Sequence, residues 1–355
     1  MQEFEWDGAV IGAPAIRYGQ QQVNHLFPQV VQKTMNYVPS YCELEKIVNL
    51  TISACDSLEG RADGRADGVV GRTDLCKLHF DFNSTIGQKY DCAASSGSSF
   101  GKRQMASAAS PAQNGTITAE CAALASAIYN GLHDSDGRRA YFWYQLGSEV
   151  SDAETDYDST TRKWIIDISE LGGDWVTRGV ELLELDNLST LDGITYDTLR
   201  DWMLEGLQRY EDVLLTTWSD LSPFQRDGGK IITYHGESDN SIPPALVWHQ
   251  LSERLVPSVL GPRTSHCNTN NLQPNAPFPQ TSLGSLIEWV EKKEMPVTLN
   301  STILSGTNQG EQQQLCAWPL HPLWKNDGKT MHCVSDQKSY DTWIYDLDAY
   351  PLPVY

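Results

Sequence analysis

The sequence predicts an α/β protein with one core domain that carries a large insertion or a second domain. Two runs are typical of strands: residues 9–11, which end in a Gly/Pro turn, and residues 230–234, a β-rich run that stops at His235-Gly236. Segments with helical periodicity lie between and after these runs. The chain has 355 residues, more than one average domain, which favours an insertion or a second domain.

The second run carries the strongest functional signal. Asp239 follows Gly236 by three residues, in a turn closed by Pro243. A strand that ends in such a turn resembles the acid turn of an α/β-hydrolase, in which an Asp orients a His that takes a proton from a nucleophile during acyl transfer. His266, directly before Cys267, is the candidate partner. The alternative is an ordinary surface turn, because Gly and Asp are common turn residues.

The charge of the chain excludes some classes of partner. The formal net charge is −20 and the isoelectric point is near 4.7, with no cluster of Lys and Arg to offset the negative surface. Such a surface repels phosphate backbones and anionic membranes, so nucleic acid and membranes are not expected partners. No segment is long and apolar enough to span a bilayer.

Cysteines and glycosylation motifs together indicate a secreted, disulfide-bonded glycoprotein. The chain has eight cysteines and five Asn-x-Ser/Thr motifs. These motifs lie at Asn49, Asn83, Asn114, Asn187 and Asn300. The N-terminus is acidic and lacks the apolar region of a signal peptide. We therefore expect the chain to begin within a longer protein.

The first half of the chain contains helical patterns and an acidic loop. Helices are expected at residues 23–35 and 42–54. The loop after Cys55 repeats Arg-Ala-Asp-Gly at 61–64 and 65–68. Carboxylates separated by glycines can point several oxygens at one hard cation such as Ca²⁺, but acidic, glycine-rich loops are also common as solvated turns.

Residues 76–111 show little regular pattern, and residues 95–103 form a polar stretch that ends in Lys102-Arg103. Residues 97–101 match the Gly-x-Ser-x-Gly nucleophile elbow, but the flanking composition is that of a linker. We therefore reject Ser99 as a nucleophile and interpret the stretch as an exposed loop that a dibasic-specific protease could cut.

The middle of the chain is rich in tryptophan and acidic residues. Residues 141–211 interleave Trp with acidic residues, a pattern that usually indicates core or interdomain packing. Helices are expected at 119–130, 196–210, 245–255 and 283–293.

Six motifs, in order along the whole chain, resemble the fungal tannase and feruloyl esterase family of secreted serine carboxylesterases, tannase branch. They are residues 6–15 (WDGAVIGAPA), 54–60 (ACDSLEG), 72–76 (RTDLC), 228–239 (GGKIITYHGESD), 266–267 (HC) and 315–319 (LCAWP).

The resemblance implies an α/β-hydrolase core, incomplete at its N-terminus, formed by residues 1–54 and 212–355. Residues 55–211 would form a lid domain with the calcium loop and a flexible linker at 93–112. It further implies hydrolysis of galloyl or hydroxycinnamoyl esters by a triad in which Asp239 and His266 are two members. The serine, within Gly-Cys-Ser-x-Gly, and the cysteine that would pair with Cys267 are not in this chain. The step from Asp239 to His266 is shorter than the family's.

The resemblance also implies a structural Ca²⁺ site and a disulfide pattern. The candidate ligands are Asp56, Glu59, Asp63 and Asp67, where Glu59 stands in place of the usual Asp and either repeat could supply the later ligand. The expected disulfides are Cys55 with Cys76 and Cys316 with Cys333. A pairing of Cys42 with Cys92 is a weaker suggestion, and Cys121 is expected to be unpaired.

Three interpretations of function remain. The chain is part of a tannase-like esterase for a small phenolic ester, or it is an inactive, calcium-stabilised secreted fragment or pseudoenzyme. In the third interpretation it is one half of a processed pair, joined through Cys267 to an N-terminal chain of the same precursor.

Overall fold

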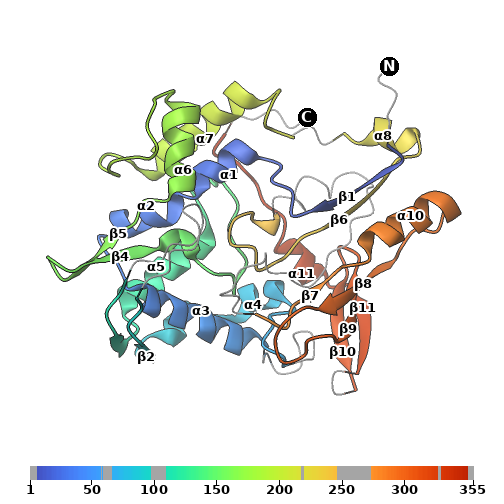
Figure 1. Cartoon of the computed structure of the whole chain (residues 1–355), viewed down its shortest axis with the longest axis horizontal. Helices are drawn as coiled ribbons and strands as arrows, with labels where there is room; N and C mark the ends of the chain where they lie inside the picture. Colours follow the sequence, from blue (N-terminus) through green and yellow to red (C-terminus); the bar gives the residue numbers. More distant parts are fainter. Residues whose placement is uncertain are drawn as a thin grey trace.

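The computed structural model describes residues 6–56, 58, 66–96, 109–216, 220–245, 273–326 and 329–350. Most helices gather on one side of the molecule, together with the strand pairs 89–92/113–116 and 155–158/163–166, and the remaining strands lie on the other side (Figure 1). The described helices are α1 (Tyr18–Asn24), α2 (Phe27–Thr34), α3 (Tyr41–Asp56), α4 (Thr73–His79), α5 (Ala119–Asn130), α6 (Glu170–Asp174), α7 (Tyr196–Tyr210), α8 (Ser222–Arg226), α10 (Ser282–Lys292) and α11 (Gln337–Asp341). Shorter turns are η1 (Phe82–Thr85), η2 (Ser151–Ala153) and the π-helical η3 (Trp175–Val180).

The described strands form small sheets. They are β1 (Gly8–Gly12), β2 (Lys89–Cys92), β3 (Gln113–Thr116), β4 (Thr155–Asp158), β5 (Lys163–Ile166), β6 (Lys230–Tyr234), β7 (Pro277–Phe278), β8 (Thr298–Ile303), β9 (Gln312–Cys316), β10 (His321–Lys325) and β11 (Thr330–Val334). β1 and β6 pair in parallel, whereas β2–β3, β4–β5, β7–β8–β9 and β10–β11 are antiparallel.

The parallel pair β1–β6 positions the acid turn. Its strands run side by side with α10 packed against them (Figure 1). Ile232 of β6 is fully buried in a cluster with Leu286 and Trp289 of α10. Gly8 leaves room for this helix, because a Cβ there would lie 2.9 Å from Leu286 Cδ1. Since parallel strands end at the same edge, the segments leading to α1 and to the acid turn leave the sheet together.

The larger hydrophobic cluster lies among the helices. It joins residues of α1, α2, α3, α5 and α7 to the buried aromatic run 141–144 and to Trp343 near the end of the described chain. α5 illustrates why these residues form a helix. The Thr118 side chain caps its N-terminus by accepting a hydrogen bond from Cys121 N, and Gly131, at φ 79°, ends it.

Disulfides join described helices and strands to one another. In the described part of the chain, Cys42 of α3 pairs with Cys92 of β2, Cys55 of α3 with Cys76 of α4, and Cys316 of β9 with Cys333 of β11. These bonds agree with the pairings implied by the resemblance and with the weaker suggestion for Cys42. Cys121 is a buried free thiol, as expected.

Most predicted elements are confirmed, including both strands and the helices at 42–54, 119–130, 196–210 and 283–293. The predicted helix at 23–35 was too long: the structure divides it between α1 and α2, with Pro28 in the first turn of α2, where its missing N–H costs nothing. The expectation of little regular structure at 76–111 was partly wrong, because η1 and β2 lie there. The predicted helix at 245–255 lies almost entirely outside the described residues.

The domain boundaries stay a prediction. Within the described residues the larger hydrophobic cluster is continuous and contains side chains from both the predicted core and the predicted lid. No helix of the described chain has the length and hydropathy needed to cross a membrane.

Candidate active site

The turn after β6 holds Asp239 in one orientation. Oδ1 of its carboxylate accepts hydrogen bonds from the backbone N–H groups of Ser241 and Ile242, both at 2.9 Å. The residue is 2 % exposed. Two backbone donors on one oxygen fix the carboxylate plane, as an Asp that orients another group requires.

His235, at the end of β6, fastens the same turn. Its Nε2 lies 2.9 Å from Ile242 O and 3.4 Å from Asp239 Oδ2. Because a carbonyl oxygen only accepts, Nε2 carries the hydrogen. His235 therefore donates to the turn through Nε2 and is not placed as a base at that atom. The sequence analysis did not assign this role, although His235 belongs to the quoted motif.

A buried His–Asp pair lies beside the turn. His25 Nδ1 is 2.8 Å from Asp152 Oδ2, and His25 Nε2 is 3.5 Å from the hydroxyl of Ser241. Burial acts to lower the pKa of His25, but the carboxylates of Asp152 and Asp239 together raise it. This shift favours the protonated, positively charged form of His25 next to the acid turn.

Further polar side chains tie α1 to the turn. Gln21 Nε2 donates to Ser241 Oγ at 3.2 Å, and Asn240 Nδ2 donates to Ser151 Oγ at 2.9 Å. The sequence analysis missed this group. The available signal was the run of Gln, Asn and His from 20 to 25, all buried on a short helix that could have been expected to bury apolar side chains.

A contact with α4 also supports the loop that follows β6. The Thr73 hydroxyl, in the first turn of α4, donates to the carboxylate of Glu237, two residues before Asp239. Thr73 is fully buried and Glu237 is 9 % exposed. The loop after β6 is therefore held by α4 as well as by α1.

A Ser–His–Asp group occurs among the described residues, but its protons point the wrong way for catalysis. Ser339 Oγ donates to Asp74 Oδ2 and lies 2.8 Å from His321 Nε2. Because the hydroxyl hydrogen is committed to the carboxylate, His321 Nε2 must donate to Ser339. A nucleophilic serine needs the opposite polarity, with the imidazole as acceptor. Ser339 is also fully buried, so the group is structural.

Arg72 completes this buried network. Its guanidinium forms a bidentate pair with Asp74, with a shortest N–O distance of 2.8 Å, and contacts Asp336 at 3.0 Å. The network joins the N-terminus of α4 to β10 and to α11. It therefore anchors the segment that carries Thr73.

The remaining predicted site residues are only partly described. His266 and Cys267 lie outside the described residues, as do Glu59, Asp63 and Ser99. Asp56 and Asp67 lie together: Asp67 N donates to Asp56 Oδ1 at 3.2 Å, and Asp67 Oδ1 accepts from Val69 N. No group of three or more metal-ligating side chains occurs within the described ranges.

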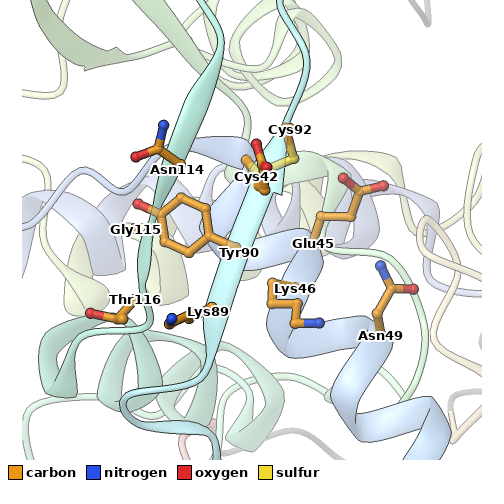
Figure 2. A pocket seen from close by; sticks show the side chains of 11 residues that line it. Cys42, Glu45, Lys46, Asn49, Lys89, Tyr90, Cys92, Asn114, Gly115 and Thr116 are labelled. Carbon is orange, nitrogen blue, oxygen red and sulfur yellow. A yellow bond between two sulfur atoms is a disulfide. The ribbon is translucent and has the colours of Figure 1, made fainter.

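A hollow of about 760 Å³ lies between α3 and the β2–β3 hairpin (Figure 2). Tyr90 stands at its centre, and the asparagines Asn49 and Asn114 of two glycosylation motifs line it. It contains none of the predicted catalytic or calcium-binding residues, so it gives no support to the predicted chemistry.

The comparisons with known proteins agree on one family. Residues 3–340 match the model of the family described as tannase and feruloyl esterase. The chain is 48% identical to a tannase of Aspergillus oryzae over 99% of this chain and 64% of that protein. It is 27% identical to a probable feruloyl esterase of Arthroderma benhamiae over 95% of this chain and 60% of that protein.

A solved structure, a tannin acyl hydrolase from Aspergillus niger, superposes with a TM-score of 0.90 at 49% identity, covering 99% of this chain and 64% of that one. The chain thus spans somewhat less than two thirds of the length of these relatives. The α/β class expected from the sequence agrees with these neighbours. The chain belongs to the tannase and feruloyl esterase family.

Proposed function

We propose that this chain is part of a serine carboxylic ester hydrolase that acts on galloyl or hydroxycinnamoyl esters. Family membership supports ester hydrolysis of the tannase and feruloyl esterase type. The single observation that carries the rest is the buried Asp239 carboxylate, fixed by two backbone amides at the carboxyl end of β6.

In this proposal Asp239 orients His266, and His266 acts first as base and then as acid. A serine outside this chain attacks the ester carbonyl while His266 takes its proton, and His266 then gives that proton to the leaving alcohol. In the second half of the reaction, His266 takes a proton from water, which attacks the acyl-enzyme. His266 then returns the proton to the serine as the acid leaves. His235 and Thr73 act on the loop that holds Asp239 and not on the substrate.

The second candidate is a catalytically inactive, calcium-stabilised secreted fragment. The buried Ser339 group is consistent with it, because the hydroxyl of Ser339 cannot act as a nucleophile. The two candidates differ in the longer protein that contains this chain. Hydrolysis of methyl gallate and labelling by a fluorophosphonate probe in that protein would support the first candidate, and the absence of both would support the second.

The catalytic assignment is tested in the longer protein that contains this chain. Asp239→Asn and His266→Ala should each lower turnover by several orders of magnitude, because base and nucleophile act as one unit. His332→Ala is the matched control, since His332 is exposed on β11. Activity of His266→Ala equal to that of the control would refute the assignment.

A structural Ca²⁺ in the acidic loop belongs to the proposal. The carboxylate of Asp56 contacts the backbone N–H groups of Asp67 and Gly68, so the two ends of the loop lie close together. Asp56 and Asp67 would supply hard oxygen ligands of the kind that Ca²⁺ prefers, with Glu59 and Asp63 as the further ligands. The ion would hold the loop between α3 and α4. It takes no part in the chemistry.

The disulfides, Cys267 and the net charge indicate the compartment and the partners of the protein. Disulfides between described elements fit an oxidising compartment, which supports an extracellular location. The partner would be a small phenolic ester, and Cys267 would bond to an N-terminal part of the same precursor. The charge of −20 supports the expectation that neither nucleic acid nor a membrane is a partner.

A further inference from the structure

One face of α3 forms a wall of the hollow between this helix and the β2–β3 hairpin. Cys42, Glu45, Lys46 and Asn49 line the hollow from α3. Their spacing of three and four residues places them on the same face, because an α-helix has about 3.6 residues per turn. The disulfide between Cys42 and Cys92 joins this wall to β2. The wall is therefore polar and is tied to the opposite side by a covalent bond.

The opposite wall is centred on the ring of Tyr90 in β2 (Figure 2). Tyr90 pairs with Gly115 of β3 in the antiparallel register. A Cβ at position 115 would lie 2.7 Å from the Tyr90 hydroxyl oxygen, so a side chain there would displace the ring. Tyr90 is partly exposed, and its ring thus offers an apolar surface to the hollow.

The charged side chains around the hollow balance one another. Glu45 and Asp91 are acidic, and Lys46 and Lys89 are basic. Within the described ranges none of these four side chains makes a hydrogen bond or an ion pair. Burial raises the pKa of the Glu45 carboxyl, as expected where no cation compensates the carboxylate. The lining therefore has no net charge and offers several unused donors and acceptors.

A neutral sugar ring matches this lining. Its hydroxyl groups both donate and accept, so they can bind carboxylates, ammonium groups and amides alike. Because the sugar carries no charge, a lining without net charge does not disfavour it. The flat C–H face of the sugar can pack on the aromatic ring of Tyr90. The volume of about 760 Å³ lies within the range of about 300–1,000 Å³ that is typical of small-molecule sites.

Two glycosylation motifs lie at this hollow. Asn49 and Asn114 line it, are exposed, and each begin an Asn-x-Thr sequence. Neither side-chain amide makes a hydrogen bond within the described part of the chain. In a third motif, by contrast, the Asn187 amide donates to Ile168 O at 2.9 Å. A sugar attached to Asn49 or Asn114 would be held near the hollow at a high effective concentration.

We propose that the hollow is a binding site for a neutral sugar, of the N-acetylglucosamine type that begins an N-linked glycan. Tyr90 packs against the ring, and Glu45 and Lys46 bind its hydroxyl groups. A glycan on Asn49 or Asn114 and a free oligosaccharide offer the same ring to these groups. No residue of the acid turn lines the hollow, so the proposal does not depend on the proposed esterase function.

The test measures binding to this chain produced in the bacterial periplasm, where disulfides form and N-glycans are not added. The probe is N,N′-diacetylchitobiose, and saturation-transfer NMR and titration calorimetry follow its binding. The parent chain should bind the probe saturably. Glu45→Ala should weaken binding about tenfold, the loss expected for one hydrogen bond to a charged group. Alanine is a strong helix former, so α3 should be preserved in this variant.

Glu184→Ala is the matched control, because Glu184 is exposed and does not line the hollow. This variant should bind the probe as tightly as the parent. Lys46→Ala alters the same face of α3 and should also weaken binding, which keeps the proposal testable if Glu45→Ala fails to fold.

The same titration on chain secreted from a glycosylating yeast identifies the source of the sugar. Binding of the probe only after Asn49→Gln or Asn114→Gln has removed a glycan would show that the chain's own glycan occupies the hollow. Equal binding with and without glycans would assign the site to a free oligosaccharide. No saturable binding to the unglycosylated parent, or equal affinities of Glu45→Ala and Glu184→Ala, would overturn the proposal.

Discussion

Ser339→Ala should destabilise the chain much more than the loss of a small hydroxyl suggests. The wild-type hydroxyl is fully buried, donates to the Asp74 carboxylate and accepts from His321 Nε2. A hydrogen bond to a charged group contributes about 2 kcal/mol and a neutral one about 1 kcal/mol, so we expect a loss of about 3 kcal/mol in the free energy of unfolding. Urea denaturation followed by tryptophan fluorescence measures this loss.

The matched control is Ser159→Ala, an exposed serine in the turn between β4 and β5, for which we expect a change within about 0.5 kcal/mol. The pH dependence gives a second check. Burial lowers the pKa of His321 in the folded state, so the unfolded chain binds a proton that the folded chain does not. Stability should fall as pH falls below about 6.5, and His321→Asn should reduce this slope. A loss for Ser339→Ala no larger than for Ser159→Ala would refute the reasoning.

If the acidic loop holds Ca²⁺, EDTA should lower the melting temperature of the chain, and the Asp56→Asn variant should melt at the same temperature with and without EDTA. Superimposable melting curves of the parent with and without EDTA would exclude the metal. Asp152→Asn should lower the pKa of His25 measured by NMR. Because that pKa is raised in the folded state, its stabilisation is full below about pH 6.5 and is lost as pH rises through the folded pKa, so the variant should lose most stability in acid. An equal loss at about pH 5 and about pH 8 would contradict this. Cys121 should resist iodoacetamide until the chain is denatured, since burial, assisted by Glu43, raises the pKa of its thiol; rapid labelling of the folded chain would show that it is accessible.

Local patterns were sufficient for the elements that carry strong periodicity or clear end signals. α7 has the bounds that helical periodicity predicts, and β6 has those of the β-rich run. The acid turn follows from a strand that ends in Gly and a carboxylate. The β2–β3 hairpin could not be predicted, because each strand has four residues and a long polar stretch separates them. Its pairing depends on contacts with α3, including the Cys42–Cys92 bond, that no local pattern encodes.

The candidate site was predictable only where its residues are close in sequence. Asp239 was found because strand and turn are contiguous. His25 and Asp152 are 127 residues apart, and Ser339 and Asp74 are 265 apart, so only the tertiary structure brings them together. The resemblance identified Arg72-Thr73-Asp74 as a motif without giving its role, which the structure shows to be a junction of buried polar contacts.

The first turn of α4 has a consequence for truncation and fusion. Over four residues it contacts the loop of the acid turn through Thr73, α11 through Asp74 and α3 through Cys76. Removing the chain from about residue 335 onward would leave the carboxylate of Asp74 and the guanidinium of Arg72 short of partners, and the disturbance would reach Glu237 through a single intervening residue. The C-terminal tail is therefore a poor place to shorten this polypeptide, although it lies about a hundred positions beyond the loop that it helps to support.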